Sequence, residues 1–147
     1  MTAGREYPTR PIVGIGIVAL RRPGHVLLVR RGRAPNAGAW SLPGGTQELG
    51  ETAEDCARRE LREETGLEAN ALHLCAAADS IHRDPDGRVR FHYTILDYCT
   101  LIGDGAVATA ADDAAELTWA AFDALDTFDL WREVRRAIDA ARQLLPL

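Results

Sequence analysis

The sequence predicts an α+β domain in which a mixed β-sheet lies between helices. Apolar, β-branched segments typical of strands lie on both sides of an acidic helical segment, residues 53–65, and an amphipathic helical segment closes the chain. Such helices bury one face against a sheet, which gives a layered architecture. The 147 residues are 46% hydrophobic and 27% charged, as expected for a folded chain, and we expect one domain over residues 1–147.

The first part of the chain supplies three of the predicted strands. Residues 12–20 form an apolar, β-branched run typical of a buried strand, and residues 25–31 form a second strand after a Pro-Gly turn. A third, short strand is expected at Trp40. Gly14 and Gly16 fall on one face of the first strand, which indicates close approach of another backbone or of a ligand.

The acidic helix has clear signals at both ends. Thr52 and Asp55 have the spacing of a capping box, with an aspartate in place of the usual glutamate. Gly66 stands where a left-handed residue ends a helix. These signals predict a helix over residues 53–65.

Three acids of this helix do not fit a purely solvated face. Glu60, Glu63 and Glu64 fall within an arc of roughly 100°, which overlaps the apolar face of the helix. Neither Glu60 nor Glu64 has a basic residue three or four positions away within the helix, so we expect a counter-charge from outside it. An all-carboxylate cluster suits Mg²⁺ or Mn²⁺. Distant arginines are the alternative partners for buried acids.

The second half of the chain predicts a hairpin, a loop, a strand and a helix. Residues 72–81 and 89–101 are strands that flank a polar Asp-Pro-Asp-Gly turn. Residues 103–113 are small and polar and predict a movable loop, residues 116–122 predict a short strand, and residues 128–145 predict an amphipathic helix. We expect the apolar stripe of this helix to lie in the core, or else to form a subunit contact in a homodimer. The stripe consists of Trp131, Val134, Ile138, Ala141 and Leu145.

Charge is divided unevenly along the chain. Residues 1–45 carry seven arginines and one acid, whereas residues 46–147 carry ten arginines and twenty-one acids. The first segment can therefore hold a polyphosphate against a cation bound by the second. Arg30 and Arg31 end the second strand, and the one that faces the acidic helix is a candidate phosphate ligand, although strand alternation does not say which. With a net charge of −5, the chain is too acidic to predict nucleic acid as a partner.

The compartment is predicted from the cysteines and the first residues. Cys56, Cys75 and Cys99 are odd in number and widely spaced, with no CxxC pair, as expected for reduced thiols. Residues 1–10 are polar, unlike a signal peptide, and no stretch approaches the length of a membrane span. We therefore expect a cytoplasmic protein with no membrane partner.

The acidic helix and the residues before it resemble a known family motif. The pattern from Gly45 to Leu67 resembles the complete signature box of the Nudix hydrolases, and residues 40–45, Trp-Ser-Leu-Pro-Gly-Gly, are similar to the usual lead-in to that box. Gln47 departs from the common pattern, because an apolar residue is frequent there, and we expect it to change local packing rather than chemistry. The nine fixed positions are filled by Gly45, Glu51, Arg59, Glu60, Leu61, Glu63, Glu64, Gly66 and Leu67.

The resemblance implies an α/β/α sandwich and a Mg²⁺-dependent hydrolase, with Mn²⁺ as the alternative cation. It implies cleavage of a nucleoside diphosphate linked to a group X by a metal-activated water that attacks phosphorus, which releases a nucleoside monophosphate and phospho-X. The general base differs among members of the family; our candidates are Glu63, Glu64 and, outside the box, Glu116, for which a surface acid at a strand start is the alternative. The implied metal ligands are Glu60, Glu64, Glu63 and the Gly44 carbonyl, with Glu51 in support, and Arg59 orients the acids. Our candidates for contact with the substrate are Arg30, Arg31, Gly44 and Gly45.

The chain also resembles short bacterial members of that family, which differ in substrate. We expect ADP-ribose or a related nucleotide sugar, with oxidised or non-standard nucleoside triphosphates as the alternative and a non-catalytic nucleotide sensor as a different class. Because the box supplies only diphosphate and metal chemistry, the substrate must be chosen elsewhere. We expect recognition by the Gly14 and Gly16 face, by the Arg30-Arg31 end and by the loops at residues 35–38 and 103–113. The two glycines leave a shallow floor, and residues 103–113 are loose enough to close over it.

Overall fold

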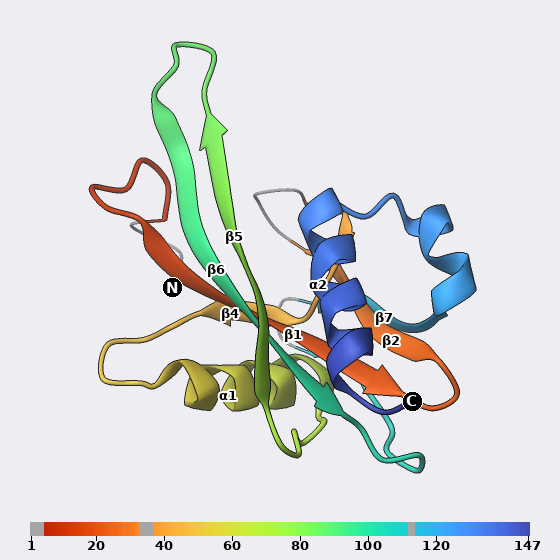
Figure 1. The fold of residues 1–147 in the computed structure, drawn as a ribbon. Coiled ribbons are helices and arrows are strands. Elements are labelled where there is room, and N and C mark those ends of the chain that lie inside the picture. Colours follow the sequence, from red (N-terminus) through yellow and green to blue (C-terminus); the bar gives the residue numbers. More distant parts are fainter. Residues whose placement is uncertain (1–4, 33–36, 112–113) are drawn as a thin grey trace.

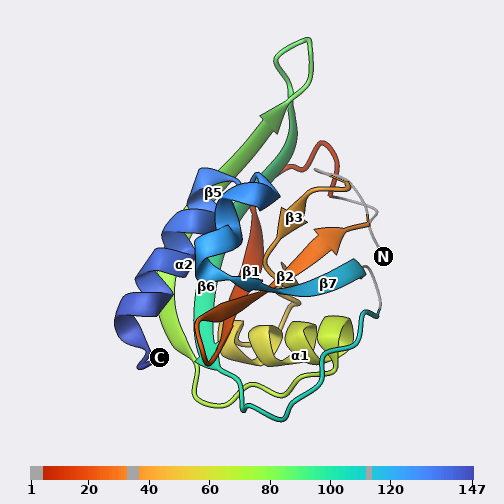
Figure 2. The ribbon, with the colours of Figure 1, turned by 90° about the vertical axis from the view of Figure 1, so that its right-hand side faces the viewer.

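The computed structural model describes residues 5–32, 37–111 and 114–147. Its strands form a twisted sheet, with one helix packed on each side (Figures 1 and 2). The α+β class and the mixed sheet between helices that the sequence predicts are confirmed. The elements are β1 (Ile12–Arg21), β2 (His25–Arg31), β3 (Trp40–Ser41), β4 (Gly44–Thr46), α1 (Ala53–Thr65), β5 (His73–Arg83), β6 (Val89–Leu101), β7 (Ala114–Ala121), η1 (Phe122–Phe128) and α2 (Arg132–Leu144).

The sheet is mixed, and it divides at one edge of β1. One edge of β1 pairs in parallel with β6 over its whole apolar length, from Ile12 to Leu20. The other edge is shared: β4 pairs antiparallel with Gly14 to Gly16, and β2 pairs antiparallel only near Leu20. The order is β3-β2-β1-β6-β5, with β7 added to β2. Because β2 and β4 leave β1 at different points, the sheet opens between them.

Alternation along β1 and β2 builds two apolar cores, one on each face of the sheet. On one face Val18 and Leu20 of β1 pack with α2 residues such as Ile138. On the other face Ile17 and Ala19 pack with α1. Strands buried on both faces carry continuous apolar runs, which is why β1 shows no polar alternation in sequence. The two cores hold α1 and α2 on opposite faces of the sheet.

Helix α1 has the ends that its sequence predicts. The Thr52 hydroxyl accepts a hydrogen bond of 3.0 Å from the Asp55 backbone N–H. Gly66 adopts a left-handed conformation with φ of 74°, and its N–H bonds the Arg62 carbonyl. The buried face consists of Cys56, Ala57, Glu60, Leu61, Glu64 and Thr65, so two acids lie among apolar side chains.

The segment before α2 differs from the prediction. The helix begins at Arg132 rather than at residue 128, because residues 122–128 form a separate 3-10 helix that ends at Asp129 in a left-handed conformation. Val134, Ile138 and Ala141 of the predicted stripe lie in the core, as expected. Trp131 instead lies at the N-cap position, where its side chain makes no capping hydrogen bond, and is 44% exposed.

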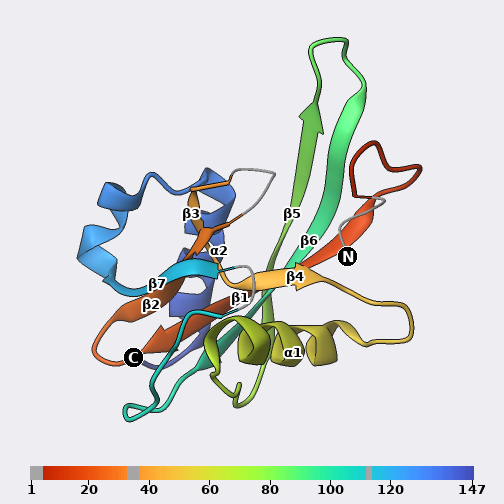
Figure 3. The same ribbon diagram turned by 180° about the vertical axis from the view of Figure 1, so that it is seen from behind.

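The remaining connections follow the sequence except at one loop. Strands β5 and β6 form a long hairpin that projects beyond the rest of the domain (Figures 1 and 3). Residues 103–111, expected to be a movable cover, are tied to the end of α1: the Thr109 and Ala111 N–H groups bond the carbonyls of Thr65 and Glu64 at 2.9 and 3.0 Å. The part of the loop that is described therefore braces α1 and does not cover the Gly14 and Gly16 face. Residues 35–36 and 112–113 lie outside the described residues.

Two further expectations concern the compartment. Cys56, Cys75 and Cys99 are all free, in agreement with the prediction of reduced thiols. None of the helices in the described part of the chain has the length and apolar character that crossing a membrane requires.

Candidate active site

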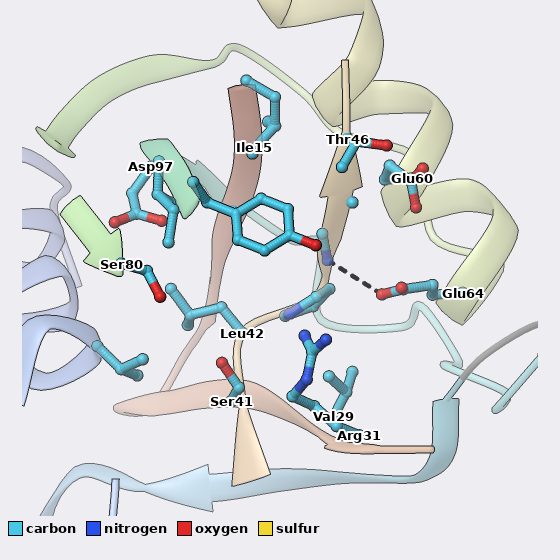
Figure 4. Close-up of a pocket in the computed structure, with 18 of the residues that line it drawn as sticks. Ile15, Val29, Arg31, Ser41, Leu42, Thr46, Glu60, Glu64, Ser80 and Asp97 are labelled. Carbon is cyan, nitrogen blue, oxygen red and sulfur yellow. Dashed lines mark hydrogen bonds between the residues drawn. The ribbon is translucent and has the colours of Figure 1, made fainter. Parts of the chain in front are cut away.

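A cavity of about 600 Å³ opens where the sheet divides, between β1, β2, β4 and α1 (Figure 4). The residues of β4 and α1 line one end, and residues of β5, β6 and the start of α2 line the other. The sequence-predicted residues Arg30, Arg31, Gly44, Gly45, Arg59, Glu60, Glu63 and Glu64 all line it. The box, the strand that precedes it and the end of β2 thus meet at one place.

Two buried carboxylates of α1 face this cavity. Glu60 and Glu64 are only 9% and 7% exposed and lie one helical turn apart. The Glu64 carboxylate accepts a hydrogen bond of 3.0 Å from the Gly44 N–H (Figure 4). Strand β4 can come this close because it lacks side chains: a Cβ on Gly45 would lie 2.3 Å from Cδ of Glu60. The glycines of the lead-in, residues 40–45, therefore allow α1 to pack close to β4.

Arg59 contacts three acids of this region. Its guanidinium contacts Glu51 at 2.6 Å, Glu60 at 2.8 Å and Glu63 at 3.2 Å. Hydrogen bonding to Arg59 lowers the pKa of Glu51 to about 2, and hydrogen bonding to Glu51 raises the pKa of Arg59. Glu60 therefore has a counter-charge within its own helix, which the spacing of three and four residues did not predict. Adjacent residues point about 100° apart on a helix, but the long arginine side chain reaches back across that angle.

Glu51 and Glu63 occupy different positions from those that the helix pattern suggested. The Glu51 carboxylate accepts hydrogen bonds from the Arg59 guanidinium and from the Glu48 N–H. Because Glu51 does not line the cavity, the structure gives it a positioning role. The Glu63 side chain is 46% exposed, which corrects its assignment to the inward face, although it still lines the cavity. The helix presents two buried acids and one exposed acid to the same space.

The donor set fits a hard divalent cation. Carboxylate oxygens are the ligands that Mg²⁺ and Mn²⁺ prefer, and Glu60 and Glu64 concentrate negative charge in a partly closed space. In the described parts of the chain, no three His, Cys, Asp or Glu side chains already stand in a metal-ligating group. A cation between the two buried acids would need further oxygen ligands, and Glu63 also lines this cavity.

The two arginines at the end of β2 have different environments. Arg30 forms an ion pair of 3.1 Å with Glu116, its neighbour across the β2 and β7 pairing. A register shift follows Arg30, and Arg31 extends into the cavity on the side facing Glu64 (Figure 4). Glu116, our candidate base outside the box, is 49% exposed at its side chain, pairs with Arg30 and does not line the cavity. The structure therefore does not bring Glu116 to the buried acids.

The far end of the cavity contains an acid that the sequence reasoning missed. Asp97 lies in β6, is 5% exposed and lines the cavity beside Ser80 (Figure 4). A Cβ on Gly16 would lie 2.2 Å from Oδ1 of Asp97, so the glycine makes room for this carboxylate. The available signal was a single acid inside the apolar run of β6. Arg5 was also missed; it lines the cavity and donates to the Thr46 hydroxyl at 3.1 Å.

Asp97 should make the free energy of unfolding depend on pH. Burial raises its pKa to about 6, opposed by Arg136; Glu133 adds to the rise, and Cys75 of β5 also faces this carboxylate. Because the folded state holds the proton more tightly, the wild type loses stability as pH rises from about 4 to about 6, by about 3 kcal/mol in total. We expect Asp97→Asn to be more stable than the wild type at about pH 8, and equally stable at about pH 4. Urea unfolding at both pH values measures this difference, and a constant offset would contradict it.

Arg59 should contribute to folding as well as to the site. The variant Arg59→Met keeps the length of the side chain but leaves Glu51 and Glu60 without their shared cation. We expect the free energy of unfolding to fall by about 2 kcal/mol at neutral pH without added metal, as measured by urea denaturation. Arg62→Met is the matched control, because Arg62 lies on the exposed face of the same helix and pairs with Glu68, which follows the helix. Equal stability of the two variants would contradict this account of the cluster.

Comparison with known proteins identifies the fold and the box together. A family model described as NUDIX domain matches residues 10–141. The chain belongs to the NUDIX domain family. A MutT NUDIX hydrolase from Burkholderia pseudomallei superimposes with a TM-score of 0.74 at 30% identity, covering 89% of this chain and 98% of that one. The NUDIX assignment accounts for the complete box and for the sheet that opens beside it.

Curated relatives of this NUDIX domain differ in the substrate that their names give, and two of them show the difference. An ADP-ribose pyrophosphatase from Methanocaldococcus jannaschii is 38% identical over 110 residues, 75% of this chain. An oxidized purine nucleoside triphosphate hydrolase from Mus musculus is 30% identical over 120 residues, 78% of this chain. The matched segments span 60% and 70% of these relatives' lengths. Both names describe enzymes that act on nucleotide phosphates.

Proposed function

We propose that this NUDIX domain hydrolyses the diphosphate linkage of a nucleoside diphosphate joined to a second group, with ADP-ribose as the preferred substrate. The observation that carries this proposal is the pair of buried carboxylates, Glu60 and Glu64, in the same cavity as Arg31. Carboxylates that bind a cation and a guanidinium that binds phosphate are together complementary to a diphosphate. The 38% identical relative named as an ADP-ribose pyrophosphatase supports the choice of substrate.

We assign the cation site to the acids of α1. Glu60, Glu64 and the Gly44 carbonyl would hold Mg²⁺, or Mn²⁺ as the alternative, with Glu63 as a further ligand. The bound cation offsets charge on the phosphate oxygens and makes a water molecule more acidic. This assignment agrees with the chemistry of the donors, since each of them offers oxygen.

The other residues of the cavity orient the substrate and accept the proton. Arg31 binds a phosphate oxygen, while Arg59, held by Glu51, keeps the Glu60 carboxylate in place. The acceptor of the proton from the attacking water is one of Glu63 and Glu64, which both line the cavity. We do not assign this role to Glu116, because its side chain pairs with Arg30 away from the acids.

A panel of substrates tests the proposal. Purified protein with Mg²⁺ is incubated with ADP-ribose, dinucleotides and nucleoside triphosphates, and the products are separated by chromatography. We expect AMP and ribose 5-phosphate from ADP-ribose, and no turnover in excess chelator. Absence of turnover on every substrate, with binding retained, would overturn the hydrolase and favour a non-catalytic nucleotide sensor.

Hydrolysis of nucleoside triphosphates is the second candidate function. The relative named as an oxidized purine nucleoside triphosphate hydrolase is matched over 70% of its length, more than the 60% of the ADP-ribose pyrophosphatase. The same panel separates the two candidates, because a triphosphate yields a nucleoside monophosphate and pyrophosphate. Higher kcat/KM for an oxidised or non-standard triphosphate than for ADP-ribose would reverse our ranking.

A further inference from the structure

We propose that Asp97 determines substrate specificity, by accepting hydrogen bonds from two neighbouring donors on the part of the nucleotide that lies away from the diphosphate. The inference rests on the proposed function, because it assumes that the phosphates occupy the end of the cavity near α1. It assigns a task to a residue outside the signature box.

The position of Asp97 in the cavity supports this role. Asp97 is only 5% exposed as a residue, yet its side chain lines the cavity, on the side opposite Glu60 and Glu64 (Figure 4). Among the described residues, none forms a hydrogen bond or an ion pair with its oxygens. Arg136, whose charge acts on this carboxylate, is engaged by Glu133 and the Ala77 carbonyl. A largely buried carboxylate without such partners loses part of its hydration and gains no protein donor in return, so a ligand that supplies donors is favoured there.

The local backbone keeps this carboxylate in place. A side chain at Gly16 would occupy the space of Oδ1, with a Cβ only 2.2 Å away. Asp97 therefore fills the floor that we had expected Gly14 and Gly16 to offer to a flat ring. The surface beneath the substrate is an acceptor rather than bare backbone.

Charge then fixes the direction in which a nucleotide lies. The end of the cavity near Asp97 also includes Glu133, whereas the other end has Arg31 and, under the proposed function, the cation held by the acids of α1, so a phosphate is favoured at the α1 end. Arg31 lies near the other end, where the Gly44 N–H points at Glu64 (Figure 4). The phosphates therefore face α1, and an uncharged, donor-bearing part of the nucleotide faces Asp97.

Two parts of a nucleotide offer neighbouring donors to one carboxylate. The ribose has two adjacent hydroxyls, and a guanine edge has a ring N–H beside an exocyclic amino group. The shared chemistry is a donor pair matched to two carboxylate oxygens, and hydrogen bonds to a charged group are stronger than those between neutral groups. A base edge rich in acceptors gains nothing from Asp97.

Direct binding of nucleoside monophosphates tests the inference without requiring turnover. Calorimetry compares GMP with IMP, which lacks the exocyclic amino group, and with dGMP, which lacks the 2′-hydroxyl, on the wild type and on Asp97→Asn. We expect the variant to bind GMP about 10- to 100-fold more weakly, which is the range for a lost hydrogen bond to a charged group. Asp79→Asn is the matched control, because Asp79 is an exposed acid on β5. It should bind like the wild type.

The pattern across ligands identifies the donors. If the wild type prefers GMP over IMP and Asp97→Asn does not, the base lies against Asp97. If the wild type prefers GMP over dGMP and Asp97→Asn does not, the ribose lies against Asp97. Equal binding of GMP by the wild type and the variant would overturn the inference, and so would a uniform loss for all three ligands. Hydrolysis of ADP-ribose with unchanged GMP binding in Asp97→Asn would reject this inference and leave the proposed function intact.

Discussion

Replacing Glu64 by glutamine should lower kcat by about 10³-fold while the domain stays folded. The amide has the same size as the carboxylate, and its oxygen can still accept the hydrogen bond from the Gly44 N–H. What is lost is a negative charge facing the cavity, and with it the affinity for a divalent cation that offsets charge in the transition state. Glu60→Gln should have an effect of similar size. Steady-state hydrolysis with saturating Mg²⁺ measures both variants.

The control for these variants is an acid on the same helix that faces solvent. Glu54 lies in the first turn of α1 and is exposed, so Glu54→Gln changes the net charge equally without touching the cavity. We expect it to keep wild-type kcat. Full activity of Glu60→Gln and Glu64→Gln, or of the wild type in excess chelator, would show that the buried acids do not bind the cation used in catalysis.

Much of the fold follows from local signals that the structure preserves. The hydroxyl of Thr52 and the left-handed Gly66 set the ends of α1 through contacts between residues that are close in sequence. The apolar runs of β1 and β2 predict strands because both of their faces are buried. Signals of this kind need no knowledge of which distant segments meet.

The features that the sequence reasoning missed depend on contacts between distant segments. Strand β4 has only three residues and is held by its pairing with β1, so its composition carries no strand signal. Asp97 becomes informative only beside Gly16, which lies far from it in sequence. The described part of the 103–111 loop is held by carbonyls at the end of α1, although its small, polar composition is typical of a mobile segment.

The pairing of Arg59 with Glu60 shows a limit of a different kind. The spacing rule considers only side chains three or four positions apart, which lie on the same face of a helix. The Arg59 guanidinium reaches Glu51, before the helix, and Glu60, the next residue, at the same time. Its reach is set by its long stem and several donors, which spacing rules do not include.

Gly44→Ala should destabilise the domain by about 3 kcal/mol or more, because the new methyl group has no space. A Cβ at this position would lie 2.0 Å from the Ile15 carbonyl oxygen and 3.1 Å from Cα of Gly16, which are backbone atoms of the central strand. A side chain can rotate away from such a contact, but backbone held on its other edge by β6 cannot move without breaking that pairing. Strand β4 must instead separate from β1, and the Gly44 N–H then loses the Glu64 carboxylate.

Urea unfolding of Gly44→Ala and of a second glycine variant tests this packing argument. Gly103→Ala is the control, because no atom lies within 4 Å of its Cβ position and its φ is not in the left-handed region. We expect the control to change the free energy of unfolding by less than about 0.5 kcal/mol. If Gly44→Ala were as stable as the wild type, β4 would not lie this close to β1. The missing side chain at Gly44 would then not explain why α1 packs close to residues 40–45. A stable but inactive Gly44→Ala would assign this glycine to the active site alone, whereas loss of both stability and activity ties the packing of β4 to the position of the buried acids.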